Sequence, residues 1–286
     1  MSRWLITGAG GMLGTDLVAA LARAGENVTA LARRDLDITD GARVHAAVRA
    51  CRPEVVVNCA AWTAVDDAES HEAEALRVNG NGAAHIAAAC AAGGARLVQL
   101  STDYVFSGDA STPYSESDAA APRTAYGRTK LAGEEAVLRT LPETGYVVRT
   151  AWLFGAHGPN FVAAMIRLER ERPQLEVVAD QRGQPTWTAD VAGQVLALIR
   201  SGAPAGVYHA TSSGETTWFG LAREVFRLLG ADQARVCPVG SGQFPRPAPR
   251  PAFSVLGHAA WARAGISPIR GWEEAVRAAL PALAAR

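Results

Sequence analysis

The stretch RWLITGAGGMLG, residues 3–14, decides the fold. Residues 3–7 predict a buried strand, and the four glycines that follow predict a tight turn. Glycines at a strand-to-helix turn let the backbone approach a pyrophosphate, whose charge rests on free N–H groups at the helix N-terminus. Glycine-rich turns also occur in ordinary strand–helix loops, so the stretch favours dinucleotide binding only through its place after the first strand. Apolar residues then recur at helical spacing until Gly25 (Met12, Leu13, Leu17, Val18 and Leu21).

The first half of the chain repeats this order of strand and helix. Apolar runs predict further strands at residues 28–31, 55–58, 96–100 and 146–149. Helices are expected after Asp40, which caps the first of them, and then at residues 73–92 and 125–140. Unbroken apolar strands that are each followed by a helix are typical of a parallel sheet covered on both faces. The sequence therefore predicts an α/β fold with a Rossmann-type, doubly wound parallel sheet.

The second half, past Trp152, alternates less regularly. It predicts a strand at residues 175–178 and helices at 161–172, 191–200, 218–229 and 272–285. We expect this half to add a smaller α/β substrate-binding domain. The dinucleotide-binding domain is then residues 1–153 plus about 185–203, and the substrate domain is about 154–184 and 204–286.

Composition narrows the classes of partner. The chain carries 28 basic and 28 acidic residues, and no Lys/Arg block gives nucleic acid or an anionic membrane an electrostatic footprint. No apolar run approaches the length of a membrane span, and the first dozen residues do not resemble a signal peptide. The four cysteines are scattered, which suits a reducing compartment, and we predict no metal site. We therefore expect a cytoplasmic protein without nucleic-acid or membrane partners.

The end of the second predicted strand bears on the choice of cofactor. Arg33 and Arg34 stand there, and guanidiniums suit the 2′-phosphate of NADPH; the alternative is a pair of solvated surface arginines. Asp37 and Ile38 are expected beside the adenine, and small side chains after the third strand leave room for the middle of the cofactor. The residues predicted to bind the cofactor are Gly8, Gly10, Gly11, Met12, Leu13, Arg33, Asp37, Ile38, Cys59, Ala60, Ala61, Tyr126 and Lys130.

Tyr126 and Lys130 stand at positions i and i+4 of a predicted helix and so share one face. Lys130 is the only lysine among 28 basic residues, which favours chemistry over solubility as its role. An ammonium beside a phenol stabilises the phenolate, so we expect the pKa of Tyr126 to fall from about 10 toward the range of a general acid. The same ammonium can donate to ribose hydroxyls of the cofactor. Thr102 ends the fourth predicted strand, where its hydroxyl can polarise a substrate carbonyl.

Two motifs, Gly8-x-x-Gly11-x-x-Gly14 and Tyr126-x-x-x-Lys130, resemble those of the extended short-chain dehydrogenases/reductases. More specifically, the chain is similar to the dTDP-4-dehydrorhamnose reductase family. The similarity runs in order along nearly the whole chain, through Asp37–Asp40, Val57–Asp66, Ser101–Phe106, Tyr126–Glu134, Arg149–Trp152, Asn160–Val162, Asp180–Thr186 and Arg250–Pro251.

The resemblance implies an oxidoreductase that reduces the C4 keto group of a dTDP-4-keto-6-deoxyhexose. The reaction would convert dTDP-4-dehydrorhamnose to dTDP-L-rhamnose with NADPH, or also with NADH, and the second domain would hold the nucleotide sugar. Thr102, Tyr126 and Lys130 are implied to be the catalytic set, and Arg250 is implied to meet the diphosphate. The residues implied to bind substrate are Thr102, Asp103, Tyr104, Trp152, Asn160, Phe161 and Arg250. We expect a monomer or a homodimer.

Alternatives remain open at this point. Trp62, Asp67, Ser107 and Arg123–Ala125 depart from the family pattern, which leaves the sugar open. A reductase of the dTDP-dihydrostreptose synthase type would apply the same chemistry to an antibiotic sugar, and a non-catalytic NADP-binding regulatory subunit would keep only the fold. An epimerase or dehydratase of the same superfamily is disfavoured, because a dehydratase usually has Asp-Glu after the strand-end Thr, whereas Tyr follows Asp here.

Two features of the second half also allow two interpretations. Trp152 is either a platform for the sugar ring or a core packing residue. The Pro-rich segment 245–251 either presents an arginine to a phosphate or binds a partner as a polyproline helix.

Overall fold

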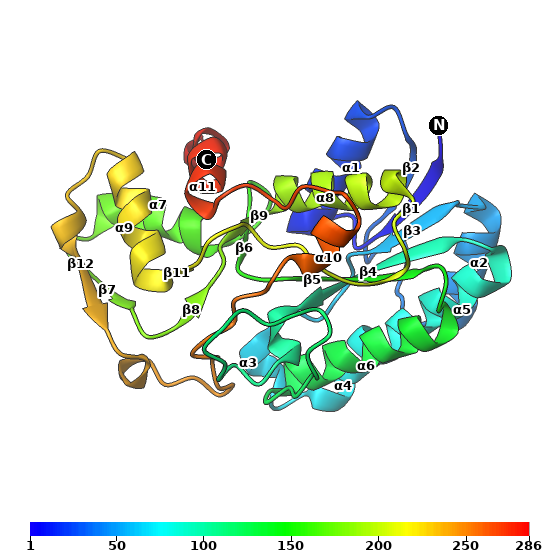
Figure 1. Cartoon of the computed structure of the whole chain (residues 1–286), viewed down its shortest axis with the longest axis horizontal. Coiled ribbons are helices and arrows are strands. Elements are labelled where there is room, and N and C mark those ends of the chain that lie inside the picture. The colour runs from blue at the N-terminus through cyan, green and yellow to red at the C-terminus, as the bar shows by residue number, and fades with distance from the viewer. Residues whose placement is uncertain (286) are drawn as a thin grey trace.

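The centre of the molecule is a six-stranded parallel sheet (Figure 1). It is seen in a computed structural model that describes residues 1–285. The strand order is β10-β5-β4-β3-β1-β2, so the order reverses at β1, which pairs with β2 on one side and β3 on the other. In doubly wound sheets, ligands bind at the carboxyl edge beside such a reversal. The strands are β1 (Arg3–Thr7), β2 (Asn27–Leu31), β3 (Val55–Asn58), β4 (Arg96–Thr102), β5 (Gly145–Thr150) and β10 (Gly206–His209).

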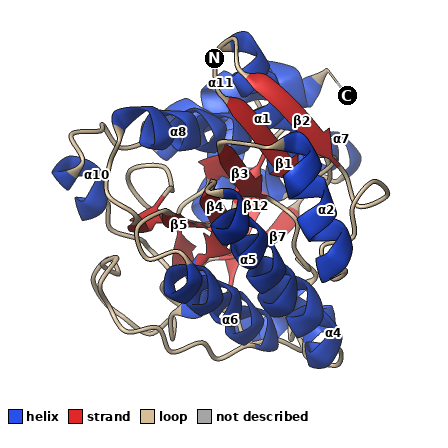
Figure 2. Cartoon of the chain, turned by 90° about the vertical axis from the view of Figure 1, so that its right-hand side faces the viewer, coloured by secondary structure: helices blue, strands red, loops and turns tan. Residues whose placement is uncertain are grey.

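Helices cover both faces of this sheet (Figure 2). Trp4 and Ile6 of β1 point to one face and Leu5 to the other, because side chains alternate along a strand. Both faces are buried, which explains the unbroken apolar runs in the sequence. The predicted Rossmann-type α/β fold is confirmed. The first face is covered by α1 (Met12–Arg23) and α8 (Thr188–Ser201), and the second by α2 (Gly41–Cys51), α5 (Ala83–Gly93) and α6 (Ala125–Thr140).

The helix expected at residues 73–92 is interrupted. It begins as α4 (Glu72–Leu76), passes through a π-helical turn at Arg77–Gly82 and continues as α5. The wider turn carries Asn79, whose side chain accepts from the backbone N–H of Trp62 at 2.9 Å and donates to its carbonyl at 3.1 Å. The interruption therefore fixes a loop that follows β3, and such turns often stand at functional sites.

The second half builds a smaller layer beside the carboxyl edge of the sheet. Its helices are α7 (Phe161–Glu171), α9 (Trp218–Leu228) and α11 (Trp272–Ala284), which share a core with the parallel pair β7 (Leu175–Val178) and β12 (Val236–Val239). Two short strand pairs join it to the sheet region: β6 (Leu153–Phe154) with β9 (Thr186–Trp187), and β8 (Arg182–Gly183) with β11 (Thr216–Thr217). The short α-helices α3 (Val65–Ala68) and α10 (Ala259–Arg263) complete the described α-helices.

The chain returns to the large sheet after this layer has begun. β10 lies within the range assigned from sequence to the substrate domain, yet it pairs with β5, with Tyr208 opposite Val148. The rest of the proposed division into two domains stays a prediction. Across residues 1–285, no helix has the length and apolar character needed to cross a membrane.

Candidate active site

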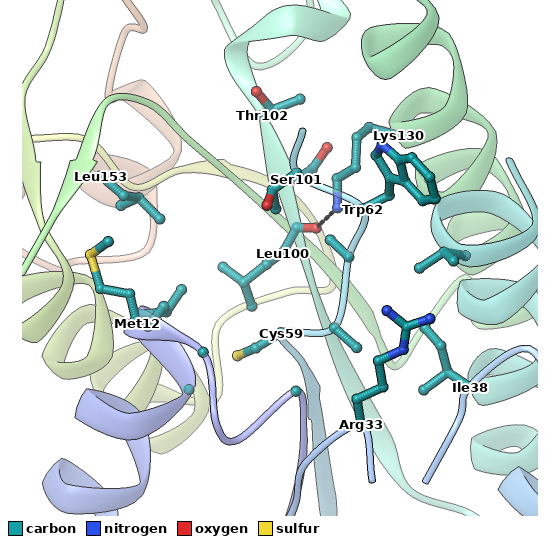
Figure 3. A pocket seen from close by; sticks show the side chains of 18 of the residues that line it. Met12, Arg33, Ile38, Cys59, Trp62, Leu100, Ser101, Thr102, Lys130 and Leu153 are labelled. Atoms are coloured by element: carbon teal, nitrogen blue, oxygen red, sulfur yellow. Dashed lines mark hydrogen bonds between the residues drawn. The ribbon is translucent and has the colours of Figure 1, made fainter. Parts of the chain in front are cut away.

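A cavity of about 1520 Å³ lies along the carboxyl edge of the sheet, at the point where the strand order reverses (Figure 3). It brings together all thirteen residues predicted to bind the cofactor, as well as Thr102, Asp103, Tyr104 and Trp152. Asn160, Phe161 and Arg250 do not line it. The cavity is also lined by residues that the sequence did not single out, among them Arg77, Asn81 and His85.

The glycine turn forms one end of the cavity. Gly8 has φ +67°, and a Cβ atom there would lie 2.5 Å from the backbone nitrogen of Ala60. The turn therefore lies directly against the segment that leaves β3, and only glycine fits it. Gly11 precedes α1 without any described side chain capping the helix, so the first N–H groups of α1 remain available at the cavity wall. This cradle fits the pyrophosphate of a dinucleotide.

The adenosine end is defined by the loop after β2. Figure 3 shows the Arg33 side chain reaching into the cavity beside Ile38. Arg34 also lines the cavity; its side chain is 89% exposed, and its guanidinium lies 3.8 Å from Asp35. The Asp37 carboxylate accepts hydrogen bonds from the backbone and hydroxyl of Thr39 at 2.9 and 2.8 Å, which hold its pKa below the usual value. Both arginines therefore lie at the adenosine end of the cavity, and either could meet a 2′-phosphate.

Lys130 is buried at the middle of the cavity. Its ammonium donates to the carbonyl oxygen of Leu100 at 2.6 Å, as the dashed line in Figure 3 marks. Burial lowers the pKa of Lys130 to about 8, while the negative charge of Glu134 opposes this shift. The lysine is thus anchored to β4 through a backbone atom, a partner that spacing along a helix does not show.

The pKa of Tyr126 is raised, whereas the sequence predicted a lowered value. Burial raises the pKa of its phenol, the charge of Asp103 adds to the rise, and a polar contact with the Thr102 side chain opposes it. The predicted lowering of this pKa by Lys130 is therefore wrong for this structure, because burial dominates and the ammonium is bound to Leu100. The phenol is therefore protonated at neutral pH, and the raised pKa makes it a weaker proton donor than the sequence led us to expect.

Asp103 stands behind Thr102. The Thr102 hydroxyl donates to Asp103 Oδ1 at 2.9 Å and accepts from the backbone N–H of Tyr104 at 3.2 Å. Asp103 is 3% exposed, and its Oδ2 has no hydrogen-bond partner among the described residues. Burial raises the pKa of this carboxyl to about 6. Tyr126, Thr102 and Asp103 thus form a row of polar groups at the end of β4.

A buried ion pair stabilises the carboxyl end of β4. Glu134, one turn after Lys130 on α6, accepts from the Arg149 guanidinium of β5 at 2.6 Å. Ser101, next to Thr102, donates to the same carboxylate. The pair ties α6 to β4 and β5, so the elements that carry Thr102 and Lys130 are held together.

The three predicted substrate residues outside the cavity have other contacts. Asn160 caps α7 by accepting from Ala163 N–H at 3.0 Å, and Phe161 packs against Trp218 with ring centroids 4.7 Å apart. Arg250 donates to Asp66 at 2.8 Å and lines a second cavity of about 160 Å³, which shares Tyr104 with the first. Their roles toward a substrate stay predictions.

Trp152 is a packing residue, as one of the two interpretations held, whereas its role as a platform for the sugar ring stays a prediction. It lines the large cavity, and its ring also stacks on Trp218 with centroids 3.6 Å apart. The ring is therefore packed and at the same time available at the cavity wall.

Comparison with known proteins shows similarity over almost the whole chain. The RmlD substrate binding domain family matches residues 2–285. The chain is 59% identical to a dTDP-4-dehydrorhamnose reductase of Streptomyces griseus, covering 99% of this chain and 95% of that one. It is 56% identical to a dTDP-4-keto-6-deoxy-D-glucose reductase of Streptomyces niveus, covering 98% and 97%.

Solved structures of dTDP-4-dehydrorhamnose reductases also superpose on this chain over nearly its full length. A dTDP-4-dehydrorhamnose reductase from Clostridium acetobutylicum superposes with a TM-score of 0.94 at 41% identity, covering 98% of this chain and 99% of that one. The Bacillus anthracis reductase, solved in complex with NADP, gives 0.93 at 37% identity, with 98% and 99% covered. The ordered motifs, the phosphate cradle and these matches lead to one conclusion: the chain belongs to the RmlD substrate binding domain family.

Proposed function

We propose that this protein reduces the C4 keto group of a dTDP-4-keto-6-deoxyhexose with NADPH, and that dTDP-4-dehydrorhamnose is its substrate. The observation that carries the proposal is the placement of the glycine cradle, Lys130 and the row Tyr126–Thr102–Asp103 around one cavity. The relatives at 59% and 56% identity, both named as reductases of dTDP-linked ketosugars, support the same chemistry.

Different parts of the cavity are proposed to bind different groups of the cofactor. The cradle at Gly8–Leu13 binds the pyrophosphate, and Arg33 binds the 2′-phosphate. Lys130, held by the Leu100 carbonyl, donates its remaining N–H bonds to ribose hydroxyls. When bound, NADPH supplies the hydride that adds to C4.

The protein supplies the proton. To orient the substrate carbonyl, the Thr102 hydroxyl would turn its proton from Asp103 to that oxygen when the substrate binds. The phenolic proton of Tyr126 passes to the C4 oxygen, which becomes a hydroxyl group. The tyrosinate that remains regains a proton from solvent. The phenol carries its proton at neutral pH, so each turnover begins with a protonated donor. The burial that raises the pKa of Tyr126 opposes proton transfer, and bound substrate and cofactor must offset this effect.

The substrate domain is proposed to hold the nucleotide sugar through Trp152, Asn160, Phe161 and Arg250. The position of Arg250 beside the second cavity, with Tyr104 between the two cavities, supports a path for the diphosphate there. Cytoplasmic location is also proposed, supported by the four free thiols of the described chain. Whether the protein acts as a monomer or a homodimer stays a prediction.

The proposal is tested by incubating the purified protein with NADPH and, separately, dTDP-4-dehydrorhamnose and dTDP-4-keto-6-deoxy-D-glucose. Loss of NADPH absorbance with formation of the 4-hydroxy product is expected. Tyr126→Phe should reduce turnover by ~10²-fold or more while NADPH still binds. A protein that binds NADPH tightly and turns over neither ketosugar would instead support the regulatory alternative, and a normally active Tyr126→Phe variant would refute the assigned proton donor.

A further inference from the structure

Trp152 has a backbone conformation that its side chain disfavours. Its φ is +45°, in the left-handed region that residues with a Cβ atom rarely adopt. Such a conformation persists where surrounding contacts over-determine it, and it concentrates at ligand sites. Thr186 N–H donates to the Trp152 carbonyl at 3.2 Å and holds the backbone. The side chain needs separate contacts to keep its place at the cavity wall.

Two contacts hold the indole. Trp218, the first residue of α9, stacks on it with ring centroids 3.6 Å apart and planes 8° from parallel. Gly183 lies so close that a Cβ atom there would approach Trp152 Cε2 to 2.5 Å. Gly183 and Trp218 come from the neighbouring region of β8 and β11, so the smaller layer fixes the ring that the cavity uses.

Trp218 is itself tied to a distant segment. Its Nε1 donates to Gln181 Oε1 at 3.1 Å, and Gln181 Nε2 donates to Ser241 Oγ at 2.8 Å. Ser241 opens the segment 241–250, which runs after β12 toward α3 in Figure 1 and ends at the ion pair of Arg250 with Asp66. The Trp152 ring is thus connected, through one stacked face and two hydrogen bonds, to the segment that carries Arg250.

We propose that Trp218 is a positioning residue that holds the Trp152 indole against the sugar, and that the Gln181–Ser241 contacts link this ring to segment 241–250. The inference rests on the proposed function, because the flat apolar face of Trp152 suits a hexose ring. Without Trp218 the strained backbone of Trp152 can relax and the ring can leave the wall. The glycine cradle and Arg33 do not stack on Trp218. Loss of Trp218 should therefore weaken binding of the sugar and leave binding of the cofactor unchanged.

The test compares Trp218→Ala and Trp218→Phe with the control Trp187→Phe, which removes an indole that does not line the cavity. Trp218→Ala is expected to raise KM for the ketosugar roughly three- to tenfold, the size of a lost aromatic stack, with Kd for NADPH unchanged. Trp218→Phe keeps an aromatic face and should restore part of this loss. Gln181→Leu cuts the hydrogen bonds while leaving the stack, and should raise KM less than Trp218→Ala.

Far-UV circular dichroism gives an independent readout, because two stacked indoles couple their transitions and give an exciton couplet when the in-plane transition axes are rotated against each other. The couplet is expected in the wild type, Trp187→Phe and Gln181→Leu, and should be lost in both Trp218 variants.

An active wild type with an unchanged ketosugar KM in Trp218→Ala overturns the role of Trp218 alone. If Trp218→Ala raises the Kd for NADPH and the KM for the ketosugar by the same factor, the positioning role of Trp218 is overturned as well. A wild type that reduces no dTDP-ketosugar overturns the proposed function and this role together. If Trp218→Ala fails to fold, Trp218→Phe and Gln181→Leu decide.

Discussion

The hydroxyl of Thr102 donates to the carboxylate of Asp103 at 2.9 Å, so the strand-end threonine offers only its lone pairs to the groups on its other side. One of these groups is the Tyr104 N–H. The Tyr126 phenol also makes a polar contact with Thr102, which suits a phenol that carries its proton. Asp103 therefore sets the direction of hydrogen bonding in the row.

Asp103→Asn should stabilise the protein at neutral pH. Burial raises the pKa of Asp103 from 3.8 to about 6, so the folded state binds this proton more tightly than the unfolded state. Stability is therefore lost as pH rises from about 4 to 6, and the variant should gain on the order of 2 kcal/mol at pH 7.5. Denaturant unfolding at pH 4 and 7.5 measures this, and the gain should vanish at pH 4. The exposed Asp118→Asn variant is the control; an equal gain in both variants would argue against the burial effect.

NADPH affinity should fall as pH rises through 8. Burial lowers the pKa of Lys130 to about 8, and only the charged ammonium makes the strong hydrogen bonds to ribose oxygens. Titration of NADPH fluorescence between pH 6 and 9.5 should show this loss in the wild type and in Tyr126→Phe. Lys130→Met should bind roughly tenfold more weakly or worse at pH 7. Its affinity should not change between pH 7 and 9, and a persisting pH dependence would point to another group.

Gly8 and Gly25 form a matched pair for testing the cradle. Both have positive φ, +67° and +76°, but a Cβ atom at Gly25 would meet nothing within 4 Å. Gly25→Ala should therefore cost only backbone strain, about 1 kcal/mol of unfolding free energy, with NADPH binding intact. Gly8→Ala adds the clash with Ala60, so we expect a larger loss of stability and NADPH binding at least about tenfold weaker. Similar behaviour of the two variants would show that the close approach to Ala60 does not shape the cradle.

Arg33 should decide the preference between NADPH and NADH. Its side chain reaches into the cavity in Figure 3, whereas the Arg34 side chain, which lines the same cavity, is 89% exposed. Removing a charge-assisted bond to the 2′-phosphate should weaken NADPH about tenfold or more and leave NADH unchanged. The ratio of kcat/KM for the two cofactors, measured for Arg33→Ser and for the control Arg34→Ser, checks this. A larger change in Arg34→Ser would reassign the phosphate contact.

The sequence predicts five of the six strands of the large sheet, because buried parallel strands leave continuous apolar runs, but it does not predict β10. β1 and β3 begin and end at the expected residues, and Asp40 caps α2 as expected by accepting from Arg43 N–H at 3.1 Å. The residues around the main cavity follow from motifs at strand ends. Such motifs are local, so they can be located before any tertiary contact is known.

Contacts between distant segments set the limits of that prediction. The bond from Lys130 to the Leu100 carbonyl spans 30 residues, and the bond from Arg250 to Asp66 spans 184. Neither partner is marked by a pattern around it. The π-helical turn at Asn79 likewise depends on the Trp62 loop that it binds. The raised pKa of Tyr126 follows from burial, which helical spacing to Lys130 does not reveal.

The chain returns to the large sheet to supply β10, so the first half should not fold as a separately expressed fragment. A fragment ending near residue 153 would lack β10 and leave β5 as an open edge, a template for pairing with other chains. It would also lack α8, which covers Trp4, Ile6 and Leu17. Attempts to express the nucleotide-binding half alone should therefore yield inclusion bodies, and useful dissection of this protein will come from point substitutions in the intact polypeptide.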